Sequence, residues 1–145
     1  MGMTEQEMIA LWEEHIGAEF ERKDVEAAMA TMTDDPFVIN VAVGSGGRGR
    51  ESVRRFYSEQ FLPSLPADNE VRVVRRIVGK NALVDEVRHA FTHDRRMEWL
   101  LPGVAPTGRR IDIEVVAIIL FDQGKIAGER IYWDHATVLR QAGLL

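Results

Sequence analysis

The side chains of this chain that could do chemistry are carboxylates and imidazoles, because its 145 residues include 23 acidic residues, four histidines and no cysteine. Glu129 shares the parity of Ile131 and Trp133 in a predicted strand, so these side chains lie on one face. Asp85 and His89 likewise share one face of an earlier predicted strand. A carboxyl group against apolar walls has a raised pKa, which suits a general acid or base near neutral pH. Whether these faces point into a cavity therefore decides what the three groups can do.

The spacing of the remaining polar residues argues against several common sites. No predicted helix carries the pair of histidines at i, i+4 that is typical of a helical zinc site, and without cysteine there is no thiolate ligand. The glycine-rich stretch 44–49 lacks the GxxxxGK[ST] form of a phosphate loop, and no GxSxG sequence occurs. His15 falls off the apolar stripe of its predicted helix, which indicates a surface position. We therefore expect no metal and no cofactor.

The first part of the chain has the pattern of helices. Thr4 with Glu7 fits a capping box and opens a helix whose apolar residues recur every three or four positions. Asp24 is a good N-cap for a second, shorter helix, which ends at Pro36 and the two aspartates before it. The remaining predicted elements are a first strand over 37–43, a turn over 44–47, a third helix over 49–62, strands over 70–78, 82–92, 109–122 and 125–133, and a closing helix over 134–145.

Helices first and antiparallel strands afterwards are typical of an α+β domain, not a doubly wound one. With 145 residues and 46% apolar residues, the chain has the size and composition of a single globular domain, residues 1–145. Its net charge of −5 argues against nucleic-acid binding. No apolar run approaches the ~18 residues of a membrane span, and the N-terminus does not resemble a signal peptide. We therefore expect a cytoplasmic protein with no membrane or nucleic-acid partner.

The strand predicted over 109–122 is apolar on both faces. One parity holds Ile111, Ile113, Val115, Ala117 and Ile119, and the other holds Val116, Ile118 and Leu120. The helices can cover only one face of the sheet, and an exposed apolar patch of this kind usually marks an interface. We therefore expect a homodimer through the back of the sheet; the alternative is a monomer with an ordinary apolar patch.

Several segments together resemble a known family. They are Asp24-Val25-Glu26-Ala27, Asp34-Asp35, Gly49-Arg50-Glu51, Pro106-Thr107-Gly108-Arg109, Phe121-Asp122-Gln123-Gly124-Lys125-Ile126, Ile131-Tyr132-Trp133-Asp134 and the ending from Val138 to Leu145. Their order is similar to that of the nuclear transport factor two-like (cystatin-like α+β) fold, and within it to the SnoaL-like polyketide cyclase group. The resemblance implies three N-terminal helices packed over a curved, mostly antiparallel sheet, forming a cone with an apolar pocket.

The resemblance also implies which faces point into the pocket. It places Trp133 inside, so Glu129 is also inward, and it makes the face of Asp85 and His89 the inner one. In the SnoaL-like cyclases an aspartate on the last strand is the acid and base, and Glu129 is the closest inward acid here. The catalytic candidates are therefore Glu129, His89 and Asp85. The expected substrate-binding residues are Trp12, Asn40, Tyr57, Phe91, His93, Trp99, Val115, Ala117, Ile131 and Trp133.

Each of these readings has a structural alternative. Glu129 could lie near a strand edge, paired with Arg88 or Arg130, and a lone histidine such as His89 is more often a satisfied core residue. The apolar loop 93–108, which contains Trp99, either closes over the pocket mouth or joins the dimer contact.

The ketosteroid isomerases share the fold, but the comparison with them is negative. Their base aspartate falls at Asn40, their tyrosine at about Ile16 and their protonated aspartate at about Ala117. We therefore do not expect steroid isomerisation by that mechanism.

The sequence favours a small cofactor-free enzyme acting on an apolar, carbonyl-bearing molecule, of the cyclase, isomerase or hydrolase type. Glu129 and His89 would transfer protons, and Asn40 with a Tyr or Trp donor would hold the developing oxyanion. One alternative is a non-catalytic binding module for an apolar ligand. Another is a limonene-type epoxide hydrolase, whose Asp–Arg–Asp arrangement we cannot assemble on inward positions of this chain.

Overall fold

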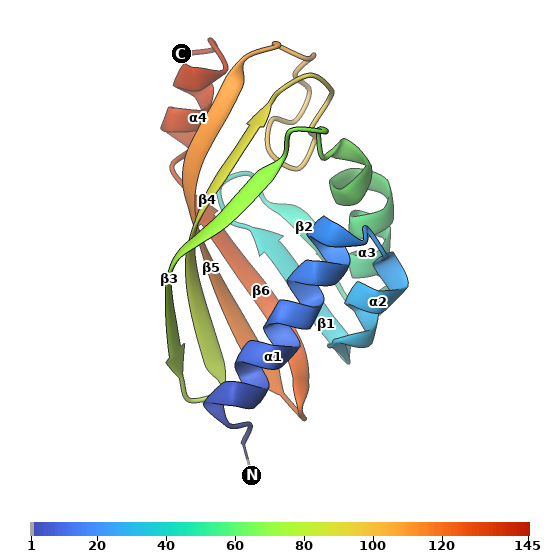
Figure 1. The fold of residues 1–145 in the computed structure, drawn as a ribbon. Coiled ribbons are helices and arrows are strands. Elements are labelled where there is room, and N and C mark those ends of the chain that lie inside the picture. Colours follow the sequence, from blue (N-terminus) through green and yellow to red (C-terminus); the bar gives the residue numbers. More distant parts are fainter. Residues whose placement is uncertain (1) are drawn as a thin grey trace.

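The computed structural model describes residues 2–145, which form helices over one curved sheet (Figure 1). The helices are α1 (Glu5–Ile16), α2 (Val25–Ala30), α3 (Arg50–Arg55) and α4 (His135–Gln141). The strands are β1 (Met32–Asn40), β2 (Ser45–Arg48), β3 (Glu70–Gly79), β4 (Ala82–Thr92), β5 (Arg110–Asp122) and β6 (Lys125–Trp133). The sheet is open and has the order β2-β1-β6-β5-β4-β3, with only β1 and β6 parallel. The predicted α+β cone is confirmed.

Two of the N-terminal helices continue as wider π-helical turns. The capping box predicted at Thr4 and Glu7 is present, and it starts α1 at Glu5. After Ile16 the chain winds through the π-helical turn η1 (Gly17–Glu21), and after α3 it winds through η2 (Phe56–Phe61) and a short 3-10 turn, η3 (Leu62–Ser64). π-helical turns are rare and are often found at functional sites. Both of these turns supply side chains to the interior described below.

The first strand and the glycine-rich turn differ from the sequence prediction. β1 begins at Met32 and contains Pro36, where its register with β6 shifts, so the proline lies at an irregularity that needs no ladder donor. The predicted turn over 44–47 is largely the edge strand β2, paired with β1. Gly46 has a φ of 129°, and a side chain there would overlap the Val38 carbonyl. Glycine is therefore what allows this close pairing, although it argues against a strand by propensity.

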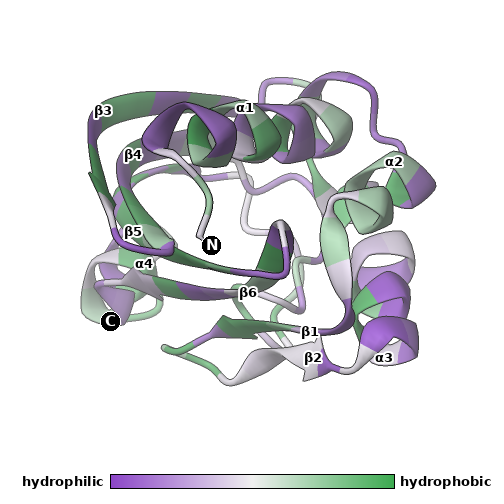
Figure 2. Ribbon diagram, turned by 90° about the horizontal axis from the view of Figure 1, so that it is seen from below, coloured by the Kyte–Doolittle hydropathy of each residue, from purple (hydrophilic) through white to green (hydrophobic). Residues whose placement is uncertain are grey.

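The core lies between the concave face of the sheet and the helices. Seen from below, the curved sheet and α1, α2 and α3 surround the interior (Figure 2). The alternation predicted for the longest strand is confirmed, because Ile111, Ile113, Val115, Ala117 and Ile119 are all buried. On the opposite face Val116 is 36% exposed in the single chain. The homodimer through this back face stays a prediction. Among residues 2–145, the structure contains no helix that is long and apolar enough to cross a membrane.

Candidate active site

A cavity of about 100 Å³ lies inside the cone, between the first helix and the concave face of the sheet. Its walls are mostly apolar and aromatic, with three acidic side chains among them. The lining residues are Trp12, Ile16, Glu19, Phe20, Asn40, Phe61, Val71, Val73, Asp85, Val87, His89, Trp99, Ile113, Val115, Ala117, Glu129, Ile131 and Trp133. All three catalytic candidates and seven of the ten expected binding residues are in this set. Few polar groups in an apolar cavity are what a small-molecule site needs.

Three expected binding residues do not line the cavity. Tyr57 and Phe91 are fully buried in the packed core, where Tyr57 reaches the cavity only through its contact with Glu129. His93 is also buried, and the backbone N–H of Thr107 donates to its Nδ1 at 3.1 Å. All three side chains are buried, as their spacing and residue types indicated. Spacing and residue type could not distinguish a position in the cavity wall from one in the packed core, because that boundary depends on how neighbouring elements pack.

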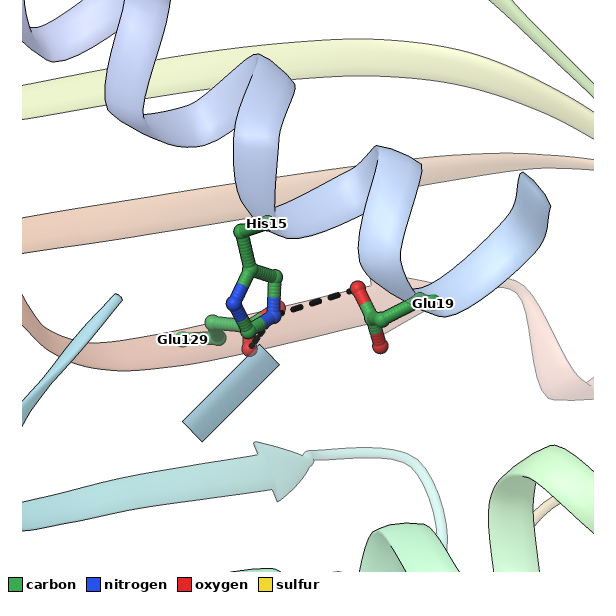
Figure 3. A group of neighbouring side chains, drawn as sticks. All are labelled: His15, Glu19 and Glu129. Atoms are coloured by element: carbon green, nitrogen blue, oxygen red, sulfur yellow. Dashed lines mark ion pairs between the residues drawn. The ribbon is translucent and has the colours of Figure 1, made fainter. Parts of the chain in front are cut away.

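The most unexpected feature of the cavity wall is a buried cluster of His15, Glu19 and Glu129 (Figure 3). His15 Nε2 lies 3.2 Å from Glu19 Oε1 and 3.2 Å from Glu129 Oε2. The predicted surface position of His15 is wrong, because the side chain is fully buried. The buried face of the first helix is Met8, Trp12, His15 and Glu19, at spacings of four, three and four residues. This spacing is visible in the sequence. Apolar residues alone did not reveal it as a buried helix face, because two of these four positions are polar.

Hydrogen bonds fix the orientation of the His15 ring and the position of Glu129. The hydroxyl of Thr31 donates to the Ala28 carbonyl, so it accepts from His15 Nδ1–H at 2.7 Å. The Tyr57 hydroxyl donates to Glu129 Oε2 at 2.6 Å and lies 3.2 Å from His15 Nε2. His15 Nε2 therefore faces three oxygens, and its remaining hydrogen is shared between two carboxylates.

The electrostatics of the cluster follow from its burial. Burial by itself would lower the pKa of His15, but the charges of Glu19 and Glu129 raise that pKa to about 10, so the ring is an imidazolium at neutral pH. Burial raises the pKa of Glu19, and the neighbouring His15 opposes this shift only in part. Burial also raises the pKa of the Tyr57 phenol, and the Glu129 charge adds to the effect. The Trp12 ring stacks on His15 with centroids 5.3 Å apart, a geometry that favours the charged ring.

Three side chains of this cluster also have the composition of a metal site. The ligand atoms of His15, Glu19 and Glu129 all lie within 4.8 Å of one another. Since the pKa of His15 is about 10, Nε2 carries a proton at neutral pH, and a metal ion would have to compete with it. The ion pairs of His15 with Glu19 and Glu129 therefore account for the close approach of these three side chains.

Asp85, the third acidic side chain in the wall, accepts three hydrogen bonds. Arg76 donates to both of its carboxylate oxygens, at 2.7 and 2.9 Å, and the Trp12 indole N–H donates at 2.8 Å. Arg76 also pairs with Glu13, whose side chain is 53% exposed, so this second carboxylate lies outside the cavity. The Asp–Arg pair therefore links the first helix to the far edge of the sheet.

His89 occupies the cavity wall as a neutral ring. Its Nε2 lies 2.6 Å from Asn69 Oδ1, which can only accept, so Nε2 carries the hydrogen and Nδ1 is unprotonated. Burial lowers the pKa of His89 to about 4. The ring also stacks on Trp99, with centroids 6.1 Å apart. The face of β4 that the sequence predicted as the inner one does point inward.

Trp99 closes the cavity from the loop 93–108. Its indole N–H donates to Ser64 Oγ at 2.8 Å, and its carbonyl accepts from the Ser45 hydroxyl. One N–H of Asn40 in turn donates to Ser45 Oγ at 2.9 Å. Of the two predicted positions for this loop, the structure thus shows the one over the pocket. The three positions compared with the ketosteroid isomerases, Ile16, Asn40 and Ala117, line the cavity without an acid or a phenol.

Comparisons with known proteins agree with this architecture. TsrD from Streptomyces laurentii superposes with a TM-score of 0.74 at 20% identity, covering 99% of each chain. AclR from Streptomyces galilaeus, described as a candidate hydroxylase, has a TM-score of 0.74 at 19% identity, covering 98% of this chain and 88% of its own. A candidate SnoaL-like polyketide cyclase from Jannaschia sp. CCS1 has a TM-score of 0.73 at 21% identity, covering 97% of this chain and 91% of its own.

These identities are low, so the likeness shows a shared fold and not a shared reaction. Other similar structures are described as a candidate ketosteroid isomerase from Kribbella flavida and an LEH-like epoxide hydrolase from M. tuberculosis, so proteins of different described activities share the fold. The search of curated proteins gave no match. The SnoaL-like domain matches residues 12–129, well over half of the chain, and this range includes every lining residue of the cavity except Ile131 and Trp133. The chain belongs to the SnoaL-like domain family.

Proposed function

We propose that this protein is an enzyme that moves protons on an apolar, carbonyl-bearing small molecule, in a reaction of the cyclase, isomerase or hydrolase type. The observation that carries the proposal is the buried cluster of Glu19, His15 and Glu129, whose two glutamates line a mostly apolar cavity. Burying charged groups costs several kcal/mol per ion before pairing, so an apolar wall would serve folding at least as well. Strongly perturbed titratable groups in a cavity favour a catalytic role.

Polar groups elsewhere in the wall would hold the substrate against this cluster. One N–H of the Asn40 amide donates to Ser45 Oγ, so its second N–H could donate to a substrate oxygen. His89 offers an unprotonated Nδ1, while its other nitrogen is held by Asn69. Aromatic side chains such as Trp99 and Trp133 would pack on the apolar part of the substrate. A substrate carbonyl that reaches the Glu19–Glu129 wall could then be protonated as charge develops on its oxygen.

A hydrogen–deuterium exchange assay tests this without knowledge of the natural substrate. A panel of apolar ketones and aromatic carbonyl compounds in D2O would be followed by NMR for exchange next to the carbonyl. We expect the wild-type protein to catalyse exchange for at least one compound and Glu129→Gln to slow it at least ~100-fold. Glu114→Gln is the matched control, because Glu114 is a solvent-exposed glutamate on the neighbouring strand. Near-normal exchange at neutral pH in a folded Glu129→Gln protein would refute the assignment.

A binding module for an apolar ligand is the main alternative. It predicts that compounds of the panel bind, as measured by calorimetry, and that none of them exchanges or turns over. It also predicts that Glu129→Gln alters affinity alone.

Epoxide hydrolysis is the second alternative, and one observation bears on it. Asp85 and Arg76 do form a pair at the cavity, although the sequence did not suggest one. The next carboxylate along, Glu13, lies outside the cavity and half exposed. Hydrolysis of a limonene-type epoxide that is abolished by Asp85→Asn would favour this alternative over the first proposal.

We also propose that the back of the sheet binds a second copy of this chain. Ile77, Val74 and Tyr132 are between 36% and 59% exposed on the strands of the single chain. Charges of both signs, including the pair of Arg75 with Glu86, surround these apolar side chains. A surface with mixed charges around an apolar centre can pair with itself about a two-fold axis.

A further inference from the structure

We propose that Glu19 is the member of the cluster that exchanges the proton with the substrate, while Glu129 holds the negative charge. This inference rests on the proposed function and assigns its acid to a residue that the sequence did not single out. Glu19 lies on the π-helical turn η1 and forms part of the cavity wall.

The donors around the two carboxylates are distributed unequally. Glu129 accepts the Tyr57 hydroxyl hydrogen at 2.6 Å and a share of the His15 Nε2 hydrogen. Glu19 has the share from His15 alone, through Oε1 at 3.2 Å. The other ring hydrogen of His15 is committed to Thr31. A carboxylate with more donors is better stabilised as an anion, so the geometry favours the charge on Glu129.

The charge balance of the cluster calls for one more proton. An imidazolium with two carboxylates has a net charge of −1 in a site where His15, Glu19 and Glu129 are at most 5% exposed. The other charged pair at the cavity, Asp85 with Arg76, is neutral in itself, and His89 is uncharged. One proton beyond the two on the His15 ring makes the cluster neutral. Glu19 is the site where binding this proton requires the least free energy, because it has fewer donors than Glu129. Burial raises the pKa of Glu19 in the same sense.

The proton cycle then follows from these positions. The O–H of neutral Glu19 breaks and its proton forms an O–H bond with the substrate carbonyl oxygen. The carboxylate left on Glu19 faces the His15 imidazolium, which is in place before the transfer and needs no rearrangement. A proton from the C–H next to the carbonyl then returns to Glu19 while the C–H electron pair becomes the C=C bond of the enol, so the enzyme ends in its starting state. Two carboxyl groups in unlike environments, one neutral and one charged, are a common basis of acid–base catalysis.

The protonation state can be measured without any substrate. Carbon-13 NMR of side-chain carboxyls in glutamate-labelled protein, assigned residue by residue, would report Glu19 and Glu129 separately. At about pH 6 we expect the Glu19 carbon to show the protonated shift and the Glu129 carbon the carboxylate shift. Glu21→Gln is the matched control, since Glu21 is exposed on the same turn and its change should leave both signals in place. The opposite assignment, or two ionised carboxyls at this pH, would overturn the proposal.

Kinetics distinguish the two glutamates by their pH profiles. In Glu129→Gln the negative charge beside Glu19 is gone, so Glu19 ionises at lower pH. The fall of the rate with rising pH should therefore begin at lower pH, and activity should be recovered in acid. In Glu19→Gln the proton carrier is absent, and exchange should fall at least ~100-fold at every pH. Recovery of Glu19→Gln in acid would refute the role of Glu19. If the NMR result holds but no compound of the panel exchanges, the protonation assignment stands and the proposed function fails.

Discussion

Tyr57→Phe removes one hydroxyl from the buried cluster and leaves the ring in place. The hydroxyl donates to Glu129 Oε2 at 2.6 Å, and both side chains are nearly inaccessible to solvent. A hydrogen bond to a charged group contributes ~1.5–3 kcal/mol, and its loss here leaves the carboxylate with only a shared hydrogen from His15. Because phenylalanine fills the same space, little packing energy is lost. We therefore expect the free energy of unfolding to fall by about 2 kcal/mol.

Urea denaturation followed by tryptophan fluorescence measures this directly, because the three tryptophans lie in or near the cavity wall. The urea midpoint should fall with an unchanged m-value, and Tm should fall by about 4–8 °C for a domain of this size. Tyr132→Phe is the matched control, since Tyr132 is 36% exposed and its hydroxyl only accepts from Arg130. That change should stay within ~0.5 kcal/mol of wild type. An equally small effect of Tyr57→Phe would refute the view that the phenol stabilises the charged cluster.

Three further predictions concern charge pairing and assembly. The folded-state pKa of His15 is raised from 6.5 to about 10, so the contribution of its charge to stability is complete below about pH 6.5 and is lost as pH rises toward 10. In His15→Gln, the free energy of unfolding measured by urea denaturation should therefore depend less on pH across that window. Asp85→Asn should cost about 2–4 kcal/mol in urea denaturation because it leaves a partly buried guanidinium mispaired, whereas Glu86→Gln, in an exposed pair, should cost less than ~0.5 kcal/mol. If the back of the sheet forms a dimer, Val116→Asp should halve the mass measured by light scattering, and an unchanged mass would exclude this interface.

The sequence predicted the fold well where local patterns and tertiary demands agree. Strands β4 and β6 have the bounds that alternation and the intervening turns predicted. Prediction failed around β2, where glycines read as a turn. Gly46 is there because its backbone approaches the Val38 carbonyl in the neighbouring strand. That constraint belongs to a contact between two strands, and propensity does not record it.

The candidate site divides in the same way. Parity placed Glu129 on one face with Trp133, and His89 on one face with Asp85. The family resemblance indicated that these are the inner faces, and both side chains line the cavity. The partners of Glu129 were not predictable from parity. Tyr57 is 72 residues away in the sequence, and His15 comes from the first helix. From the sequence, Tyr57 was expected to bind substrate and His15 to lie on the surface, and neither was expected to contact Glu129.

The sequence by itself determined the fold class, the side chains that share each strand face and the presence of a carboxylate among apolar residues. These follow from the two periodicities of side chains, 3.6 and 2.0 residues, which act locally. Only the tertiary structure decided that His15 and Glu19 meet Glu129, that Trp99 covers the cavity and that Asp85 is paired with Arg76. The charge on each group depends on burial and on neighbours from distant segments, and both exist only once the chain has folded.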